Sequence, residues 1–418
     1  MSPCIADVGL IAFVEDEWEG PWMVPHQILT RLSRYFHVVW SSPVPSLRQA
    51  LYLSLQRPRQ LVDHGFAPKP GLTIYRPKRW LTATGRPHFF AEWTERERLR
   101  RAQQILLAQG CRKTILYVWR PCFERVIDLI PHDVSCYHIE DEYTFSEMEK
   151  PLDEGEARLI SRVDQVFIHS PGLLEKKGQL NPQTLRVPNG VDYHAYATPH
   201  NEPADLKPIP HPRIGYVGRI KRQLNLSLLS ALAQRHREWS FVFVGPQSGL
   251  DEHATFQKLS HMPNVYFLGS KPVRMLPAYT QHLDVCMLCY EMNDYTKFIY
   301  PLKLHEYLAS GRPVVGSPIR SLLEFAQIIR LARTTDEWSQ ALHDSLAPAA
   351  SSVSQIEARR SIARKYDWNR LVELIAYTLC DRLGPEYLER FEQISLRDQT
   401  VTRLLSDHAQ KNRLFSNG

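Results

Sequence analysis

Short apolar runs that alternate with longer stretches of helical character are the strongest constraint on how this chain folds. The runs expected as strands cover residues 8–14, 37–41, 72–75, 114–119, 134–138 and 163–169, and then 213–217, 240–244, 264–268, 283–288 and 313–316. Buried parallel strands read as short continuous apolar runs, and strands that alternate with helices form sheets covered on both faces. The pattern therefore predicts a doubly wound α/β protein.

Length and one shift in composition divide this pattern into two domains. A chain of 418 residues exceeds a single typical core. Residues 193–212 are rich in Pro and His and lack a strand or helix pattern, which is typical of a linker. We expect one Rossmann-like domain over residues 1–192 and a second over 213–365, facing each other across a cleft. Ligands of such sheets bind beyond the carboxyl ends of the strands.

The chain ends in helical sequence, and nothing in it has the pattern of a membrane span or a secretion signal. Residues 366–396 have apolar side chains at helical spacings, and the polar residues 397–418 are expected to be a tail. The N-terminus has no basic region before its first apolar run, which we interpret as a strand. Seven scattered cysteines fit free thiols in a reducing cytoplasm better than a disulfide framework.

The stretch 300–316, YPLKLHEYLASGRPVVG, is the first candidate for a binding site. Pro301 suits the first position of a helix, and Gly311 suits the position just past its end. Lys303 then lies in the first turn, where the helix dipole favours anions, and a bound phosphate would resolve that conflict. Glu306 faces the same way and could accept hydrogen bonds from sugar hydroxyls. Taken alone, an ion pair between Lys303 and Glu306 is the simpler interpretation.

Two further sequence strings favour the interpretation of residues 300–316 as a binding site. The string 215–219, GYVGR, directly follows a strand of the second domain, so that Gly218 lets the backbone approach a ligand and Arg219 can bind a diphosphate with two hydrogen bonds. The string 186–192, RVPNGVD, forms a tight turn between the domains. Together the three strings resemble the retaining GT-B glycosyltransferases, which use nucleotide-activated sugars. The resemblance covers about residues 5–380 and is greatest to bacterial members of teichuronic acid or exopolysaccharide synthesis.

The resemblance implies a donor site in the second domain. It assigns the diphosphate to Arg219, Lys303 and the helix start at Pro301 and Leu302, and it assigns the nucleotide ribose to Glu306. It also implies that residues 366–396 cross back onto the first domain. Neither a metal ion nor an organic cofactor is expected, because these cations can stabilise the leaving diphosphate themselves.

The sequence departs from the family's pattern at two positions of this donor site. The Lys that usually stands five positions after Arg219 is replaced by Leu224, so its role passes to Lys221, to Arg222 or to nothing. The first of the family's two Glu, which contacts the donor sugar, is replaced by Phe298. The second departure leaves the identity of the sugar open.

The first domain offers three candidates for the sugar and the acceptor. Gly20 lies in the loop after the first strand, among acids that would repel a phosphate. Arg120 ends another strand, in the loop that the resemblance places over the donor sugar, where many members carry a His. Asp141 matches the acidic position of the exopolysaccharide-type members and could orient or deprotonate an acceptor hydroxyl. The acids 140–142 could instead bind a divalent cation or simply begin a helix.

We therefore expect a cytoplasmic glycosyltransferase of polysaccharide biosynthesis that moves a sugar, with retention and without metal, from a nucleotide-diphosphate sugar to a hydroxyl of a glycan or lipid-linked glycan. A sugar-nucleotide epimerase and a non-catalytic two-lobed binding protein are the alternatives. The net charge of +6 suits acidic ligands, and no nucleic-acid motif accompanies it. Basic and aromatic residues at 76–81 and 88–93 suit peripheral contact with an anionic membrane, although an ordinary loop and helix that pack on the core are the simpler interpretation.

Overall fold

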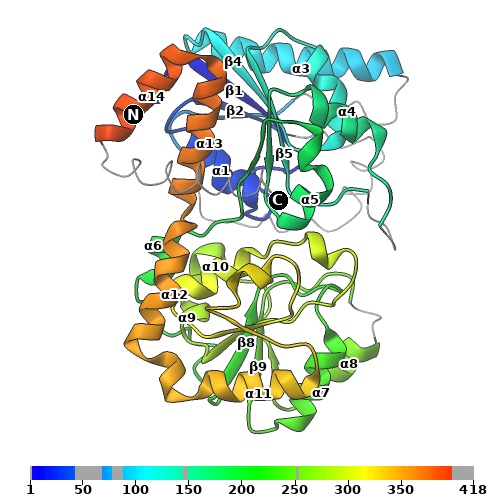
Figure 1. Ribbon diagram of the computed structural model, residues 1–418, viewed down its shortest axis with the longest axis vertical. Coiled ribbons are helices and arrows are strands. Elements are labelled where there is room, and N and C mark those ends of the chain that lie inside the picture. Colours follow the sequence, from blue (N-terminus) through cyan, green and yellow to red (C-terminus); the bar gives the residue numbers. More distant parts are fainter. Residues whose placement is uncertain (1, 43–67, 78–87, 145–148, 251–253, 398–418) are drawn as a thin grey trace.

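The protein consists of two lobes, each built on one parallel sheet (Figure 1). The computed structural model describes residues 2–42, 68–77, 88–144, 149–250 and 254–397, and of residues 88–91 and 396–397 only the helical backbone. The prediction of two Rossmann-like α/β domains is confirmed. None of the helices in the described ranges is long and apolar enough to cross a membrane.

The first lobe contains a seven-stranded sheet in the order β3-β2-β1-β4-β5-β6-β7. Its strands are β1 (Val8–Phe13), β2 (His37–Ser41), β3 (Leu72–Tyr75), β4 (Lys113–Val118), β5 (Val134–Ile139), β6 (Gln165–Ile168) and β7 (Thr184–Arg186). The edge strand β7 was not predicted, because its three residues are only partly buried and form no apolar run. A central strand is buried on both faces and is easier to detect.

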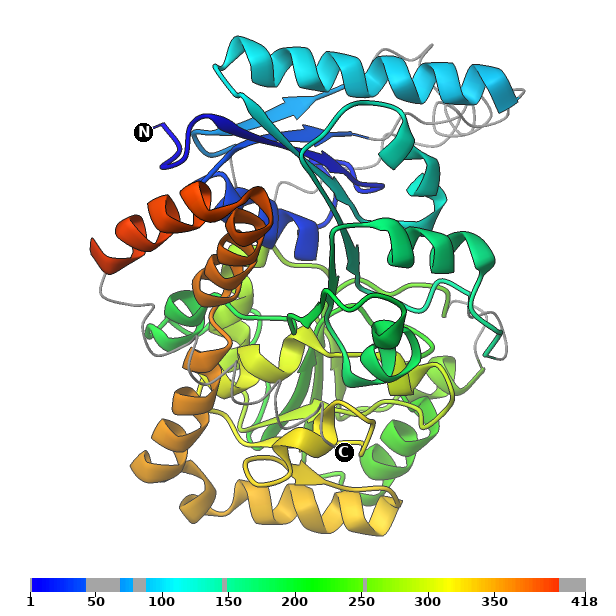
Figure 2. The ribbon, with the colours of Figure 1, turned by 45° about the horizontal axis from the view of Figure 1, so that its top comes forward.

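Side chains of β1 alternate between two layers of helices. Leu10 and Ala12 pack in one core, and Ile11 and Phe13 pack in the other, because successive residues of a strand point to opposite faces. The first core lies under α1 (Val24–Leu32) and α13 (Trp368–Leu383), and the second lies under α3 (His88–Ala108), α4 (Glu154–Arg162) and α5 (Pro171–Lys177). Figure 2 shows α3 along one face of the sheet and α13 on the opposite side. The loops at the carboxyl ends of the strands are thus held by two packed layers.

The second lobe contains a six-stranded sheet in the order β10-β9-β8-β11-β12-β13. Its strands are β8 (Arg213–Val217), β9 (Ser240–Val244), β10 (Val265–Phe267), β11 (Val285–Leu288), β12 (Val314–Gly316) and β13 (Arg330–Leu331). Among its helices are α7 (Leu226–Arg235), α8 (Ala254–Ser260), α9 (Leu276–Gln281), α10 (Leu302–Ala309) and α11 (Thr335–Leu346). The two-residue strand β13 was not predicted, since its length gives no recognisable pattern.

The segment 193–212, which we predicted as a linker, packs on the second lobe. It begins with α6 (Tyr193–Ala197), and it buries Leu206 and Ile209 in the core of that lobe. The carboxylate of Asp205 accepts a hydrogen bond of 2.7 Å from the Tyr279 hydroxyl. Its Pro-rich composition therefore marks a segment with little regular structure, not one without contacts.

The chain crosses between the lobes twice at one place. The backbone N–H of Val191 donates to the carbonyl of Tyr366 at 2.9 Å, and the N–H of Trp368 donates to the carbonyl of Val191 at 2.9 Å. Helix α12 (Val353–Lys365) lies on the second lobe, whereas α13 lies on the first and α14 (Pro385–Arg397) follows it there (Figure 1). Paired crossings fix the position at which the two lobes can turn relative to each other.

A second contact between the lobes forms around the short helix η5 (Thr296–Phe298). Phe298 is 2% exposed and packs in the core of the first lobe, together with Leu173 of α5. A Cβ atom on Gly172 would lie 2.5 Å from the carbonyl oxygen of Lys297, so only glycine permits this approach. The position at which the family carries a Glu is therefore used here to join the lobes.

Candidate active site

The second-lobe half of the site is built by α10 and by the loop after β8. Pro301 is the N-cap of α10, one residue before the first helical position that we predicted for it. Gly311 lies just past the C-cap with φ of +76°, a conformation that glycine adopts without strain, as the sequence predicted. Leu302 and Lys303 thus open a helix whose first N–H groups have no helical acceptor.

Lys303 and Glu306 form the ion pair that helical spacing allows, with 3.1 Å between Nζ and Oε2. Both side chains are mostly buried, 18% and 15% exposed. A Cβ atom on Gly218 would lie 2.6 Å from Cε of Lys303, so the lysine stem lies directly on this glycine. Burial and then Glu306 raise the pKa of Tyr196, which places that carboxylate beside its hydroxyl. Gly218, Lys303 and Glu306 therefore form one contiguous group.

Arg219 and Lys221 point from the second lobe toward the first. Burial lowers the pKa of Lys221, and the charge of Asp141 in the first lobe opposes that change. Arg219 acts electrostatically on Asp16, which also belongs to the first lobe. Leu224, at the position of the family's Lys, is 1% exposed and belongs to the core. Lys221 is consequently the cation after Arg219 that faces the other lobe.

The first-lobe half consists of residues that follow neighbouring strands. Asp16 follows β1, Arg120 follows β4 and Glu140 follows β5, and these three strands are adjacent in the sheet. Arg120 pairs with Glu15 at 3.2 Å, and its guanidinium lies 4.9 Å from the ring centroid of Tyr143. Although burial favours its neutral form, the surrounding groups, led by Tyr143 and Glu15, hold its pKa above the usual value.

Glu140 is the most unusual carboxyl group in the described part of this site. Its Oε1 atom is shielded from solvent and has no hydrogen-bond partner among the residues that the structure describes. Burial raises its pKa to about 8, against the opposing charge of Arg120 and with further contributions from Asp16 and Asp141. Glu140 is therefore mostly protonated at neutral pH.

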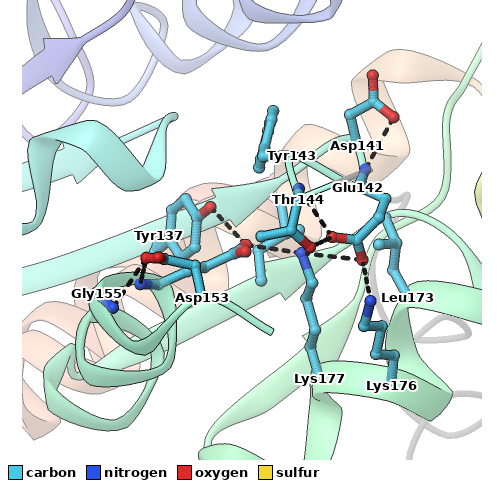
Figure 3. Close-up of polar contacts among 12 residues, drawn as sticks. Tyr137, Asp141, Glu142, Tyr143, Thr144, Asp153, Gly155, Leu173, Lys176 and Lys177 are labelled. Carbon is cyan, nitrogen blue, oxygen red and sulfur yellow. Dashed lines mark hydrogen bonds and ion pairs between the residues drawn. The ribbon is translucent and has the colours of Figure 1, made fainter. Parts of the chain in front are cut away.

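Asp141 is held by the second lobe. The hydroxyl of Tyr295 lies 3.0 and 3.1 Å from its two carboxylate oxygens. Glu142, the next residue, points the opposite way and lies 3.2 Å from Lys176 and 3.4 Å from Lys177 (Figure 3). Within the described residues, no three His, Cys, Asp or Glu side chains are grouped so that they could hold a metal ion.

A buried network of charges supports the loop that carries Asp141. Lys177 is fully buried and lies 2.8 Å from Glu156, which also accepts a 3.0 Å hydrogen bond from the Tyr137 hydroxyl (Figure 3). Burial opposes ionisation of Glu142, but hydrogen bonds from Thr144 and the charge of Lys177 lower its pKa overall. The network fixes the turn that follows β5.

The network continues into the second lobe through Glu149. Its carboxylate pairs with Lys176 at 3.2 Å and also with Lys297, next to Phe298. Lys176 in turn lies 5.3 Å from the ring centroid of Phe298. The acidic turn of the first lobe and η5 of the second are therefore joined by charge as well as by packing.

A hollow of about 720 Å³ opens in the first lobe next to Arg120. Tyr143, whose ring lies against Arg120, is part of its wall. Carboxylates supply much of the remaining lining, from Glu92, Glu95, Glu124, Asp153 and Glu154. This hollow provides space and hydrogen-bond acceptors within the first lobe.

Gly20, the remaining predicted site residue, is accounted for by contacts within its own loop. The N–H of Gly20 donates to the carbonyl of Glu17 at 2.9 Å, and a Cβ atom there would lie 3.0 Å from that oxygen. Gly20 is thus explained by a tight turn. Of the two basic and aromatic segments, residues 78–81 and the side chains of 88–91 lie outside the described residues, while Arg76 pairs with Glu19.

Sequence reasoning missed Asp16 and Tyr295, and it considered Glu140 only among the acids 140–142 that could bind a cation or begin a helix. Asp16 and Glu140 each follow a predicted strand within the same sheet, and this position was the signal that could have identified both as site residues. No local signal identified Tyr295, because its partner Asp141 is 154 residues away in the chain.

Comparison with known proteins agrees with this architecture. Residues 211–347 match the family model described as Glycosyl transferases group 1, so the second lobe carries a group 1 glycosyltransferase domain. A Bacillus subtilis protein named as a teichuronic acid biosynthesis glycosyltransferase, TuaH, is 29% identical over 246 residues. That match covers 55% of this chain and 60% of the relative, so the chain aligns with less than two thirds of that protein.

Solved structures show the same GT-B fold at low sequence identity. HepE of Anabaena, in complex with UDP and glucose, superposes with a TM-score of 0.61 at 14% identity and covers 90% of this chain and 99% of its own. The UDP-forming α,α-trehalose-phosphate synthase of Burkholderia xenovorans, in complex with glucose-6-phosphate, superposes with a TM-score of 0.60 at 11% identity. That match covers 90% of this chain and 99% of the synthase. The predicted GT-B architecture is therefore confirmed.

Proposed function

We propose that this protein is a glycosyltransferase that moves a sugar from a nucleotide-diphosphate sugar to a hydroxyl of a glycan or lipid-linked glycan, with retention and without a metal ion. The observation that carries this assignment is the group formed by Gly218, Lys303 and Glu306 at the start of α10, beside Arg219 and Lys221. It lies in the lobe that matches the group 1 glycosyltransferase model.

Stabilisation of the leaving group is the chemistry that these residues can supply. When the anomeric bond breaks, its electron pair stays on the departing phosphate oxygen, and Arg219, Lys303 and the free N–H groups of α10 can bind the resulting charge. A helix dipole alone contributes only about 0.3–2 kcal/mol, so the two cations must contribute much of the effect. Glu306 would hold the ribose hydroxyls when Lys303 turns toward the diphosphate.

The acceptor is proposed to bind against the first lobe, between the facing edges of the sheets. Tyr143, whose ring lies against Arg120, borders the hollow of about 720 Å³, which has room for a sugar, and carboxylates in the lining of this hollow can accept hydroxyl hydrogen bonds. Asp141 is proposed to orient the acceptor when Tyr295 releases it. A lipid-linked acceptor would bring the protein to the inner face of the cytoplasmic membrane.

Nucleotide binding is the most direct test. UDP, ADP, GDP and dTDP are screened by thermal shift, because a ligand at 100 times its Kd stabilises a fold by about 2.7 kcal/mol. One diphosphate should raise Tm, and Lys303→Ala should abolish the rise, whereas Lys258→Ala on the exposed surface of α8 should not. If no nucleotide diphosphate raises Tm, the proposal is wrong.

Transfer itself is measured with the matching nucleotide sugar and a panel of p-nitrophenyl glycosides as acceptors. Nucleotide release that depends on the acceptor supports a transferase. Formation of an epimer from the donor alone would instead support a sugar-nucleotide epimerase of the same fold.

A further inference from the structure

Glu140 occupies a place in the fold where no structural role accounts for it. It follows β5 directly, at the sheet edge that faces the second lobe. Asp16 and Arg120, which follow the adjacent strands β1 and β4, are the charged groups of neighbouring loops that act on it. Asp16 and Arg120 also interact electrostatically with each other, and Asp16 interacts with Arg219 of the second lobe.

The Glu140 carboxyl lacks the hydrogen bond that a buried polar atom normally has. Oε1 is shielded from water and unpartnered among the described residues. Leaving such an atom unpaired costs about 1–3 kcal/mol. The cost is typical of an atom that a ligand satisfies, and Glu140 adjoins Asp141, which is proposed to orient the acceptor.

The two neighbouring acids already have partners. Asp141 binds Tyr295 through both oxygens, and Glu142 is held by Lys176 and Lys177. Of the three consecutive acids in this turn, Glu140 alone has no hydrogen-bond or ion-pair partner among the described residues.

We propose that Glu140 binds the acceptor sugar as a neutral carboxylic acid, donating one hydrogen bond through its O–H and accepting one through its carbonyl. This assignment rests on the proposed function. It separates acceptor binding from proton removal, because a carboxyl group that keeps its proton cannot serve as the base.

Burial is the main reason why Glu140 stays neutral. Burial raises its pKa to about 8, with Arg120 opposing and with Asp16 and Asp141 adding to the rise. Tyr117 of β4 and Tyr143 are the other titratable groups in electrostatic contact with it, and burial raises the pKa of both. A bound diphosphate adds negative charge and displaces water, and both changes favour the protonated form further.

If Glu140 keeps its proton, the acceptor's proton must go to another group. The bond between the anomeric carbon and the phosphate oxygen breaks, and the acceptor oxygen forms the new bond to that carbon. The phosphate oxygen keeps the electron pair of the broken bond and receives the proton of the acceptor hydroxyl. Glu140 retains its own proton throughout.

Two substitutions distinguish a neutral ligand from a base. Glu140→Gln keeps one donor and one acceptor at the same length, so kcat and the KM for the p-nitrophenyl glycoside acceptor should stay within about 3-fold of wild type. Glu140→Ala should raise that KM by about 5- to 10-fold, the effect of one or two lost hydrogen bonds, with the KM for the nucleotide sugar unchanged.

The pH profile gives the second readout. Wild type should lose acceptor affinity as pH rises above about 8, because ionised Glu140 can no longer donate, and Glu140→Gln should not show this loss. If Glu140→Gln is as impaired as Glu140→Ala, or if neither variant affects the acceptor KM, the assignment is wrong.

Infrared difference spectra of the wild type minus Glu140→Gln test the protonation state without any substrate. A protonated carboxyl band that disappears as pH rises through about 8 is expected. Its absence at neutral pH overturns the assignment even if transfer occurs. Failure of the wild type to transfer from every nucleotide sugar overturns the proposed function, and the role in acceptor binding with it.

Discussion

The two faces that meet between the lobes are built in different ways. The second-lobe face is a local design, in which a glycine loop and the start of α10 bring Gly218 and Lys303 into contact. The first-lobe face gathers single residues from the ends of separate strands, such as Asp16 and Glu140, and a buried charge network supports it. The comparison teaches that short backbone motifs can assemble one face of the site, whereas the opposite face depends on how the whole sheet is assembled.

Removing the buried cation of the first-lobe network should have the largest effect. Lys177→Met leaves Glu142 and Glu156 without their common partner, and an uncompensated buried charge costs about 3–5 kcal/mol. Urea unfolding should show this loss, whereas Lys258→Met on the exposed surface of α8 should leave stability within about 0.5 kcal/mol. Equal stabilities of the two variants would show that the first-lobe face does not depend on the network.

Removing a cation of the second-lobe face should affect catalysis and not stability. Arg219→Ala and Lys303→Ala should each lower kcat by about 10²- to 10³-fold, because each removes stabilisation of the leaving diphosphate. Circular dichroism and Tm should remain close to wild type, and Arg235→Ala, far along α7, is the matched control. Near-normal turnover in either site variant would refute the roles given to these residues.

Acid should weaken the first lobe more than the second. Burial lowers the pKa of His138 to about 3 and of His169 to about 4 in the first lobe, and the pKa of His305 to about 3 in the second. The unfolded chain binds these protons near pH 6.5, so stability is complete above that pH and falls as pH drops toward 4.

In that pH window, each of these histidines contributes about 1.4 kcal/mol per pH unit to the slope of the unfolding free energy. Urea unfolding at pH 7, 6 and 5 measures the total slope, and His138→Gln should remove one part of it. A stability that does not change between pH 7 and 5 would contradict the neutral, buried state of these side chains.

Loosening the contact between the faces should have the smallest effect. Tyr295→Phe removes the hydroxyl that binds both oxygens of Asp141, which is worth about 0.5–1.5 kcal/mol. We expect nucleotide affinity, measured by calorimetry, to change by less than about 10-fold, while acceptor KM changes because Asp141 is freed. Tyr266→Phe in β10 is the control, and the prediction fails if both variants behave alike.

Much of the second-lobe site could be predicted because its signals are local. Pro301, Gly311 and the spacing of Lys303 and Glu306 are read within a single helix, and the ion pair at that spacing is present. Even here, the sequence did not fully explain why position 218 is a glycine. From the sequence we related Gly218 to a ligand, but the atom that lies against it belongs to Lys303, 85 positions along the chain. Glycine leaves room for a side chain as well as for a ligand.

The sequence by itself determined the fold class, the alternation of strands and helices, and the cation-bearing helix start, because each follows from short-range periodicity and backbone chemistry. Only the tertiary structure decided which acids face the second lobe, because parallel strands bring distant loops to one edge of a sheet. It also decided that Phe298 joins the lobes and that Oε1 of Glu140 is shielded from water without a hydrogen-bond partner among the described residues. Burial and electrostatic environment are properties of the assembled chain, and no spacing within the sequence encodes them.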